Sequence, residues 1–265
     1  MADSNDNPAS QHQPLDIAAL DAAFAPLTLG RPLIYHQAIE STNSEAMALA
    51  RRGGAEGTLV TTDNQTAGRG RLGRVWLSLP NEQLALSLVL RPPFSPHFLV
   101  MASALAVAEA IEATTGLRPG IKWPNDVQID GRKVCGILIE TSEAIAVLGI
   151  GINVNGSLAS IPELAGRTTT LADALGHPLA REPLFIELVR RLDGLYVALR
   201  TGGEQAQRQL REAWRARLVT LGQHVTILQT GRTITGIAED VDATGGLVVA
   251  ADDGTRHTIT WGDVE

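Results

Sequence analysis

Cysteine and lysine are scarce in this chain of 265 residues. The single cysteine, Cys135, excludes a disulfide framework and is typical of a reducing compartment. Only two of the 22 basic residues are lysines, and both of them, Lys122 and Lys133, lie in one short segment. Arginine's planar fork and lysine's compact charge are not interchangeable at a phosphate. The segment that contains both lysines is therefore a candidate site, with chance placement as the alternative.

Targeting and membrane-spanning patterns are also missing. Residues 1–16 are polar and acidic, which excludes a signal peptide. The longest apolar run, within residues 98–108, is too short to cross a bilayer. The formal net charge of −7 disfavours broad nucleic-acid binding, which needs a basic surface. We therefore expect a cytoplasmic protein with no DNA partner and no membrane partner.

The chain divides into three parts by composition and pattern. Residues 1–28 form a polar tail with one short helical pattern at 15–24. Residues 29–217 alternate between strand-like and helix-like segments, which predicts an α+β domain with a mixed β-sheet flanked by helices. The expected strands are residues 32–39, 57–62, 84–90, 134–140 and 144–154, and the expected helices are 95–116, 183–200 and 204–217. The longest helix is expected to have Ser95 as its N-cap and Pro96 at its first position.

Residues 218–265 change in character. Short strand-like runs alternate with turn signals at Gly231, Gly245-Gly246 and Asp253-Gly254. This spacing predicts a small C-terminal SH3-like β-barrel of about five strands.

An arginine–glycine segment, residues 68–76 (GRGRLGRVW), is the most informative stretch. It matches G-x-G-x-x-G, but residues 75–79 look extended and end at Pro80-Asn81, so no helix opens there as a dinucleotide site requires. Three arginines in six residues repel one another when the segment is empty. An anion would satisfy several guanidinium groups at once. We expect a loop that orders over a phosphate-bearing ligand; a solvated or RNA-contacting loop is the alternative.

Both lysines belong to a predicted hairpin. Residues 122–126 (KWPND) precede a strand, and Asp130-Gly131 is a strong two-residue turn signal. Strict alternation along the second strand places Lys133, Cys135 and Ile137 on one face. Lys133 is then expected to point into a cleft near Asn125 and Asp126, rather than into solvent.

Two further segments combine polar groups or glycines with regular structure. Thr42-Asn43-Ser44-Glu45 fits a capping box at the start of a helix, and such an N-terminus can also bind a polar head group. The glycines of residues 149–153 (GIGIN) interrupt an apolar strand, which indicates close approach of a ligand or another backbone. A cap without a ligand and a bent core strand are the alternatives.

Taken in order, the segments STN, QTAGRGRLGRVW, KWPND, GRKVCGILIE and GIGINVN resemble the biotin protein ligase family over about residues 32–265. The resemblance implies the catalytic fold of the biotin and lipoate ligases, similar to class II synthetases. It also implies activation of biotin by ATP to biotinyl-5'-AMP, followed by transfer to a lysine of a biotin carboxyl carrier protein of a carboxylase such as acetyl-CoA carboxylase.

The resemblance also assigns the site residues. Biotin or its activated form would be bound by Ser41, Thr42, Asn43, Gln65, Arg69, Gly70, Arg71, Lys133 and Gly149. The nucleotide would be bound by Arg69, Arg74, Trp76, Lys122, Asn125 and Asn153, with Trp76 packed on the adenine. Lys133, Arg71 and Asp126 would be catalytic, with Asp126 steering or deprotonating the incoming lysine. ATP and Mg²⁺ would enter together as substrate, with no tightly bound cofactor and no metal ligand from the protein.

Some positions depart from the family pattern. Leu72 stands where a basic or polar residue is common, and residues 261–265 end short of a basic residue that some members place near ATP. Fewer than about 30 residues precede the catalytic region, too few for a winged-helix domain, so no repressor role is expected. A lipoate-protein ligase and a non-catalytic biotin sensor are the alternative functions, and a monomer or weak homodimer is expected.

Overall fold

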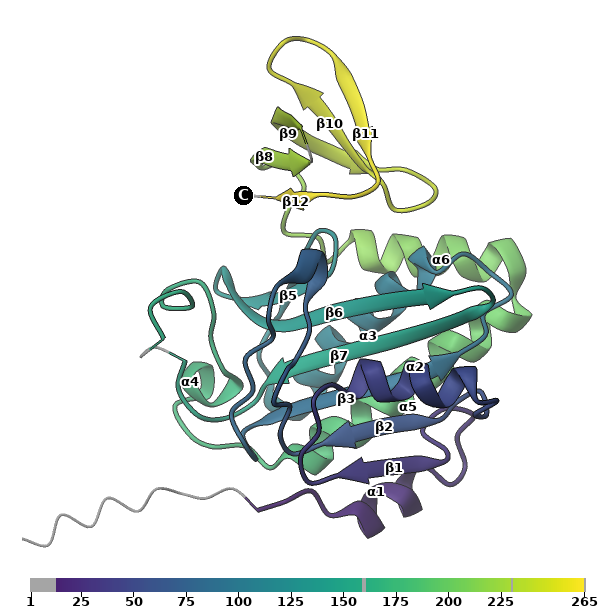
Figure 1. The fold of residues 1–265 in the computed structure, drawn as a ribbon. Helices are drawn as coiled ribbons and strands as arrows, with labels where there is room; N and C mark the ends of the chain where they lie inside the picture. The colour runs from purple at the N-terminus through teal and green to yellow at the C-terminus, as the bar shows by residue number, and fades with distance from the viewer. Residues whose placement is uncertain (1–12, 159–160, 230, 265) are drawn as a thin grey trace, which may run out of the picture.

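The computed structural model describes residues 13–158, 161–229 and 231–264. Figure 1 shows a large sheet flanked by helices, with a small sheet above it. The large sheet has seven strands in the order β1-β2-β3-β7-β6-β5-β4. Only β1 and β2 are parallel, joined by the helix α2, whereas every other neighbouring pair is antiparallel. The predicted mixed sheet is therefore confirmed. Its strands are β1 (Leu33–His36), β2 (Leu59–Thr62), β3 (Gln83–Leu90), β4 (Gly120–Lys122), β5 (Asp126–Ile129), β6 (Arg132–Ser142) and β7 (Ile145–Asn153).

Helices cover both faces of this sheet. On one face α2 (Thr42–Arg51) packs over β2, β3 and β7 through a small cluster that includes Ala46, Val89 and Val147. On the other face lies α3 (His97–Thr115), against which α5 (Arg181–Thr201) and α6 (Gly203–Arg215) pack. The short α1 (Ile17–Phe24) packs on α5, and α4 (Leu171–Leu175) follows the loop after β7.

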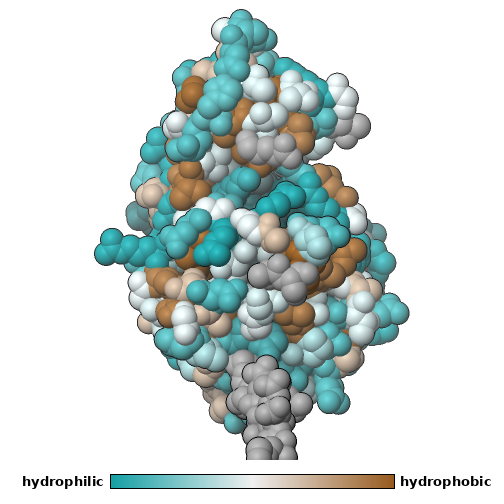
Figure 2. Space-filling model, turned by 90° about the vertical axis from the view of Figure 1, so that its left-hand side faces the viewer, coloured by the Kyte–Doolittle hydropathy of each residue, from teal (hydrophilic) through white to brown (hydrophobic). Residues whose placement is uncertain are grey.

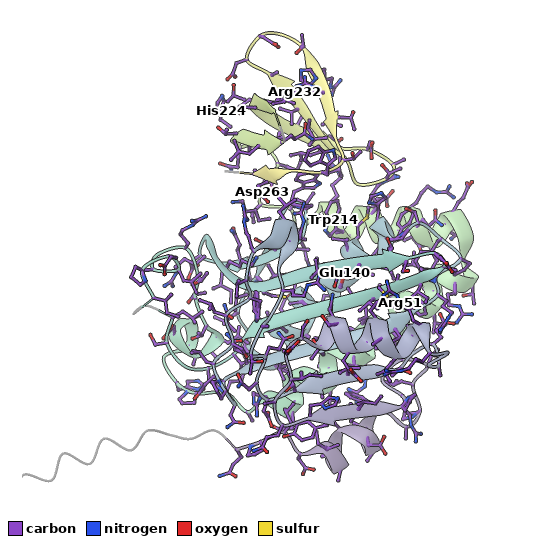
Figure 3. All side chains as sticks on the ribbon, in the orientation of Figure 1. Arg51, Glu140, Trp214, His224, Arg232 and Asp263 are labelled. Carbon is purple, nitrogen blue, oxygen red and sulfur yellow. The ribbon has the colours of Figure 1, made fainter. Side chains whose placement is uncertain are left out.

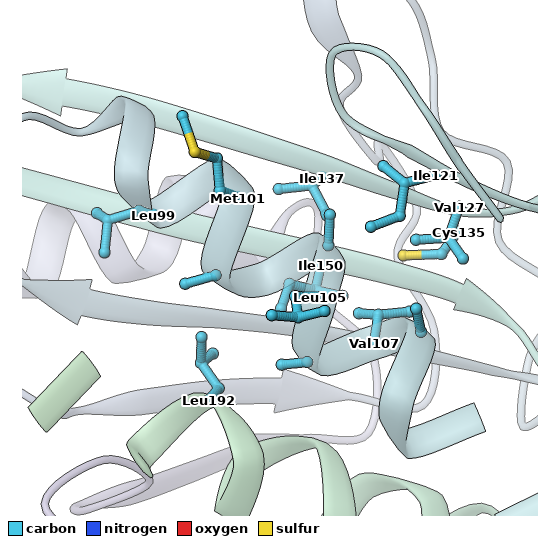
Figure 4. Close-up of a cluster of buried hydrophobic side chains, with 14 of the residues drawn as sticks. Leu99, Met101, Leu105, Val107, Ile121, Val127, Cys135, Ile137, Ile150 and Leu192 are labelled. Carbon is cyan, nitrogen blue, oxygen red and sulfur yellow. The ribbon is translucent and has the colours of Figure 1, made fainter. Parts of the chain in front are cut away.

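The main hydrophobic core lies between the sheet and α3. Figure 4 shows Leu105 of α3 beside Ile150 of the sheet, and Leu99, Met101 and Ile137 belong to the same buried cluster. Among the described residues α3 is the one helix long and apolar enough to span a membrane, but 67% of its apolar window is buried inside the protein. Its apolar surface is nearly continuous because the sheet, α5 and α6 surround it, so α3 is a core helix.

Alternation along the central strands separates the two faces. In β7, Leu148, Ile150 and Ile152 enter the main core, while Gly149 and Gly151 lie on the α2 face. Since α2 covers only part of this face, the glycines of the central strands leave space on it.

The small sheet has five antiparallel strands in the order β11-β10-β9-β8-β12. This agrees with the predicted small β-domain of about five strands. It is tied to the large sheet by two bonds from Trp123: its N–H to Thr220 Oγ1 (2.9 Å) and its Nε1 to the carbonyl of Gly245 (2.9 Å). The strands are β8 (His224–Gln229), β9 (Arg232–Val241), β10 (Leu247–Ala251), β11 (Arg256–Ile259) and β12 (Asp263–Val264).

Several boundaries differ from the prediction. The N-cap of α2 is Ser41, whose Oγ accepts from the Ser44 N–H, so the predicted capping box at Thr42 is wrong by one residue. Pro96 is the N-cap of α3, one position later than expected. The short elements β4, β12 and α4 were not predicted, because segments of two to five residues show little periodicity.

A buried ion pair joins α5 to the large sheet. Arg181 Nη2 lies 2.8 Å from Asp63 Oδ1, and both side chains are 3% exposed. The Tyr35 hydroxyl donates to Asp63 Oδ2 at 2.5 Å. Burial and this bond to Asp63 raise the pKa of Tyr35 to about 12. The pair is therefore part of a hydrogen-bonded network, which offsets the cost of desolvating two charges.

We predict that Asp63→Asn lowers the free energy of unfolding by about 3–5 kcal/mol, because Arg181 is left as a buried charge without its counter-ion. Urea unfolding measures this effect. Asp21→Asn is the matched control, since the Asp21–Arg31 pair is about half exposed on both sides and should contribute less than about 1 kcal/mol. Equal effects of the two substitutions would contradict the prediction.

Candidate active site

A cavity of about 1020 Å³ lies on the α2 side of the large sheet, beneath the arginine–glycine segment. Figure 2 shows hydrophilic residues gathered where the small sheet meets the main body. Every residue that the sequence predicted for the site lines this cavity. They are Ser41, Thr42, Asn43, Gln65, Arg69, Gly70, Arg71, Arg74, Trp76, Lys122, Asn125, Asp126, Lys133, Gly149 and Asn153.

Glycines form part of the cavity floor. Gly136 of β6 and Gly151 of β7 are cross-strand partners, and the Trp76 ring lies directly over them. A Cβ atom at Gly151 would lie 2.6 Å from the ring, and one at Gly136 would lie 3.0 Å from it. Any side chain at either position would displace the indole.

A polar cluster at the start of α2 forms one end of the cavity; we call Thr42, Asn43, Gln65 and Ser87 the α2 cluster. Asn43 Oδ1 accepts from Ser87 Oγ at 2.6 Å and lies where a Cβ of Gly149 would be, 2.1 Å away. The close approach predicted at Gly149 is thus made by the Asn43 side chain and not by another backbone.

Gln65 has a fixed orientation within this cluster. Its Oε1 accepts from both the backbone N–H and the hydroxyl of Thr42, at 3.0 and 3.2 Å. The amide nitrogen is therefore at the opposite end, near Gly68. An amide NH₂ carries two donors, so Gln65 can offer hydrogen bonds to an acceptor in the cavity.

The three arginines of the segment are each held by a different partner. Arg69 pairs with Glu140 of β6 (2.8 Å), Arg71 donates to Asn125 Oδ1 (2.6 Å) and to the carbonyl of Gly262 (3.2 Å), and Arg74 pairs with Asp263 of β12. These contacts offset the repulsion between the arginines that the sequence indicated. Burial lowers the pKa of Arg71, while Asp263 and Asp126 oppose this shift.

Lys133 points into the cavity, but on a different face from the one predicted. A β-bulge between β5 and β6 pairs Gln128 with Lys133 and Val127 with Cys135, so Val134 is an extra residue. Lys133 consequently shares a face with Gly136, 3.1 Å from where its Cβ would be, while Cys135 and Ile137 enter the core. The prediction that all three side chains share one face is wrong.

Lys133 is paired with Asp126, as the predicted hairpin implied. Its Nζ lies 2.7 Å from Asp126 Oδ1, and the two side chains are 30% and 25% exposed. Its backbone is also fixed, since its N–H donates to the carbonyl of Arg167 and its carbonyl accepts from Thr169, both at 2.9 Å.

Asn153, at the end of β7, also lines the cavity, and both ends of its side-chain amide form hydrogen bonds. Its Oδ1 accepts from Gln83 Nε2 (3.1 Å) and its Nδ2 donates to the carbonyl of Thr169 (3.2 Å). One N–H remains for a ligand.

The sequence reasoning missed several residues of the site. Ser87 gave a signal, as a polar residue inside the apolar run 84–90, whereas Glu140, Asp263 and Arg167 are single charges without a local pattern. In the described part of the chain no group of three or more His, Cys, Asp or Glu residues could hold a metal ion.

Comparison with known proteins places these features in a family. Residues 36–157 match the Biotin/lipoate A/B protein ligase family, and residues 220–265 match the Biotin protein ligase C terminal domain. The bifunctional ligase/repressor BirA of Bacillus subtilis is 34% identical over 247 residues, which are 89% of this chain and 74% of that protein. The biotin–[acetyl-CoA-carboxylase] ligase of Mycobacterium tuberculosis is 34% identical over 84% of this chain and 85% of its own length.

Solved structures of biotin protein ligases have a similar fold. The biotin protein ligase of Aquifex aeolicus, in complex with biotin and ATP, is similar with a TM-score of 0.78 and 30% identity, covering 89% of this chain and 98% of that one.

We predict that Gly149→Ala lowers the free energy of unfolding by about 1–3 kcal/mol, because the new methyl group displaces the Asn43 amide. Chemical denaturation measures the loss. Gly194→Ala, at a helical position with open space around it, should be neutral or stabilising. Adding Asn43→Ala to Gly149→Ala should recover part of the loss; no recovery would place the clash elsewhere.

Proposed function

The chain belongs to the biotin protein ligase family, and from this premise we propose how its cavity activates biotin with ATP and transfers it to a carrier lysine. The activity is that of a biotin–[acetyl-CoA-carboxylase] ligase, as in relatives that share about a third of its residues. The observation that carries the proposal is that residues of all five sequence motifs line one and the same cavity.

The α2 cluster is proposed to bind the ureido ring of biotin. A cyclic urea has one carbonyl acceptor and two N–H donors. Gln65 offers an amide NH₂, and Ser41 and Thr42 offer hydroxyl groups at the same end of the cavity. The aliphatic side chain of Leu138, the cross-strand partner of Gly149, also lines the cavity and suits the apolar part of the ligand.

The nucleotide is proposed to occupy the region around Trp76, with the indole packed on the adenine and Asn153 donating its remaining N–H. Lys122, Asn125, Arg69 and Arg74 are proposed to contact the phosphates and ribose. Mg²⁺ is proposed to enter with ATP as part of the substrate.

Lys133 and Arg71 are proposed to neutralise charge in the first step. A biotin carboxylate oxygen attacks the α-phosphorus, the bond to the β-phosphate breaks, and pyrophosphate leaves. Pre-positioned cations stabilise the charge that develops in such a step. Their present partners, Asp126 and Asn125, are exchanged for phosphate oxygens when the ligand binds.

The second step needs no nucleophile from the protein. The amine of the carrier lysine attacks the biotinyl carbonyl, AMP leaves, and an amide forms. Cys135 cannot serve as an acyl carrier, because it is fully buried and burial raises the pKa of its thiol. The partner is proposed to be the biotin carboxyl carrier domain of a carboxylase, in the cytoplasm, with the ligase as a monomer or weak homodimer.

The test is ATP–pyrophosphate exchange by the purified protein with biotin, with lipoate, and with neither. Exchange that depends on biotin alone is expected. Exchange with lipoate instead would keep the chemistry but overturn the assignment of the α2 cluster. Binding of biotin without exchange would favour a non-catalytic biotin sensor.

Asp126 is proposed to act in the second step. The Lys133–Asp126 ion pair is broken when Lys133 turns to the phosphate, which frees the carboxylate to orient or deprotonate the carrier lysine. General-base catalysis typically contributes a factor of about 10²–10⁴. We predict that Asp126→Asn slows single-turnover transfer from preformed biotinyl-AMP at least about tenfold and changes exchange less than about threefold. Transfer as fast as wild type would refute the role, as would equal losses in both steps.

A further inference from the structure

Glu140 lies near the end of β6, and its two carboxylate oxygens contact two different parts of the site. Its Oε2 accepts from Asn43 Nδ2 at 2.9 Å, and its Oε1 lies 2.8 Å from Arg69 Nη2. Figure 3 labels Glu140 on the large sheet, with Asp263 on the small sheet above it. Asn43 and Arg69 both line the cavity, and Glu140 does not. Glu140 therefore acts on a ligand through its neighbours.

Asn43 depends on Glu140 for its orientation. Ser87 donates to the oxygen end of the amide at 2.6 Å, and Glu140 accepts from the nitrogen end. With both ends bonded, the amide cannot flip or rotate. Without Glu140, only the oxygen end would be held, and Asn43 lies beside Thr42, whose N–H and hydroxyl orient Gln65.

Arg69 depends on Glu140 in the same way. Its remaining side-chain contact is a long one, 3.4 Å from Nη1 to Ser44 Oγ. Arg71 and Arg74 are attached elsewhere, to Asn125 and to Gly262 and Asp263 of the small sheet. The Arg69–Glu140 pair therefore attaches the start of the arginine–glycine segment to the α2 end of the cavity.

We propose that Glu140 is a positioning residue for biotin. Its carboxylate fixes the position of the α2 cluster, which is proposed to bind the ureido ring, relative to the arginine–glycine segment that covers the same cavity. The inference rests on the proposed function. It implies that Glu140 affects biotin binding more than nucleotide binding. Both of its partners, Asn43 and Arg69, are assigned to the biotin end, whereas Arg69 is only one of four residues assigned to the phosphates and ribose.

The test is the biotin and ATP dependence of pyrophosphate exchange in Glu140→Gln. The neutral amide keeps the shape but loses the charge and one acceptor. We expect the KM for biotin to rise about tenfold, with the KM for ATP within about twofold and kcat within about threefold of wild type. Glu109→Gln is the control, because the Glu109–Arg191 pair has the same 2.8 Å length and its carboxylate is similarly exposed, but neither residue lines the cavity.

A double-mutant cycle with Arg69→Gln tests the pair itself. If Glu140 acts partly through Arg69, the two substitutions are not independent. The fold-increase in the biotin KM of the double variant should then be well below the product of the fold-increases of the two single variants. A biotin KM in Glu140→Gln equal to that of Glu109→Gln, or fully multiplicative effects in the cycle, would overturn the proposal. If Glu140→Gln only destabilised the protein, it would raise the KM values for biotin and ATP together or lower kcat. Either result would also overturn the proposed role of Glu140.

Exchange by the wild-type protein tests the proposed function separately from the role of Glu140. Absence of biotin-dependent exchange in the wild type contradicts the proposed function. Normal exchange in the wild type with no selective effect in Glu140→Gln contradicts only the role of Glu140.

Discussion

Gly136, Gly149 and Gly151 leave part of the α2 face of β6 and β7 without side chains, and the site is built on that bare surface. On the opposite face the same strands are fully packed, with Ile137 and Ile150 against α3. One face therefore supplies the stability, while the other gives room to Asn43 and to the Trp76 ring. Because protein interiors are close-packed and resist small changes in volume, the core behind the glycines also holds the backbone of the floor in place.

Three of the cations that line the cavity are paired with carboxylates of the protein itself. Lys133 is paired with Asp126, Arg69 with Glu140 and Arg74 with Asp263. A phosphate must compete with these carboxylates, which reduces the net gain from each contact. The arrangement favours a ligand that replaces several partners at once over a simple anion that replaces one. Selectivity for a large, multiply charged ligand follows from this competition.

The sequence was most informative where chemistry requires a local motif. The arginine–glycine segment, the KWPND stretch and the glycine-containing strand could each be recognised, because glycines, a turn signal and a rare lysine stand out from their surroundings. The face of Lys133 could not be predicted, since the bulge at Val134 depends on pairing with β5 and leaves no signature in β6 alone. Glu140 and Asp263 were missed for a related reason: their importance comes from arginines 71 and 189 residues away in the chain.

The contacts of Arg71 and Arg74 with Gly262 and Asp263 also bear on how the protein is made. They join a segment in the first third of the chain to residues near position 265, across 191 and 189 positions. During synthesis the large sheet and α3 can assemble well before the last strand leaves the ribosome. Asp263 of β12 can join the cavity lining only afterwards, so a growing chain can hold a folded core before it holds a complete site.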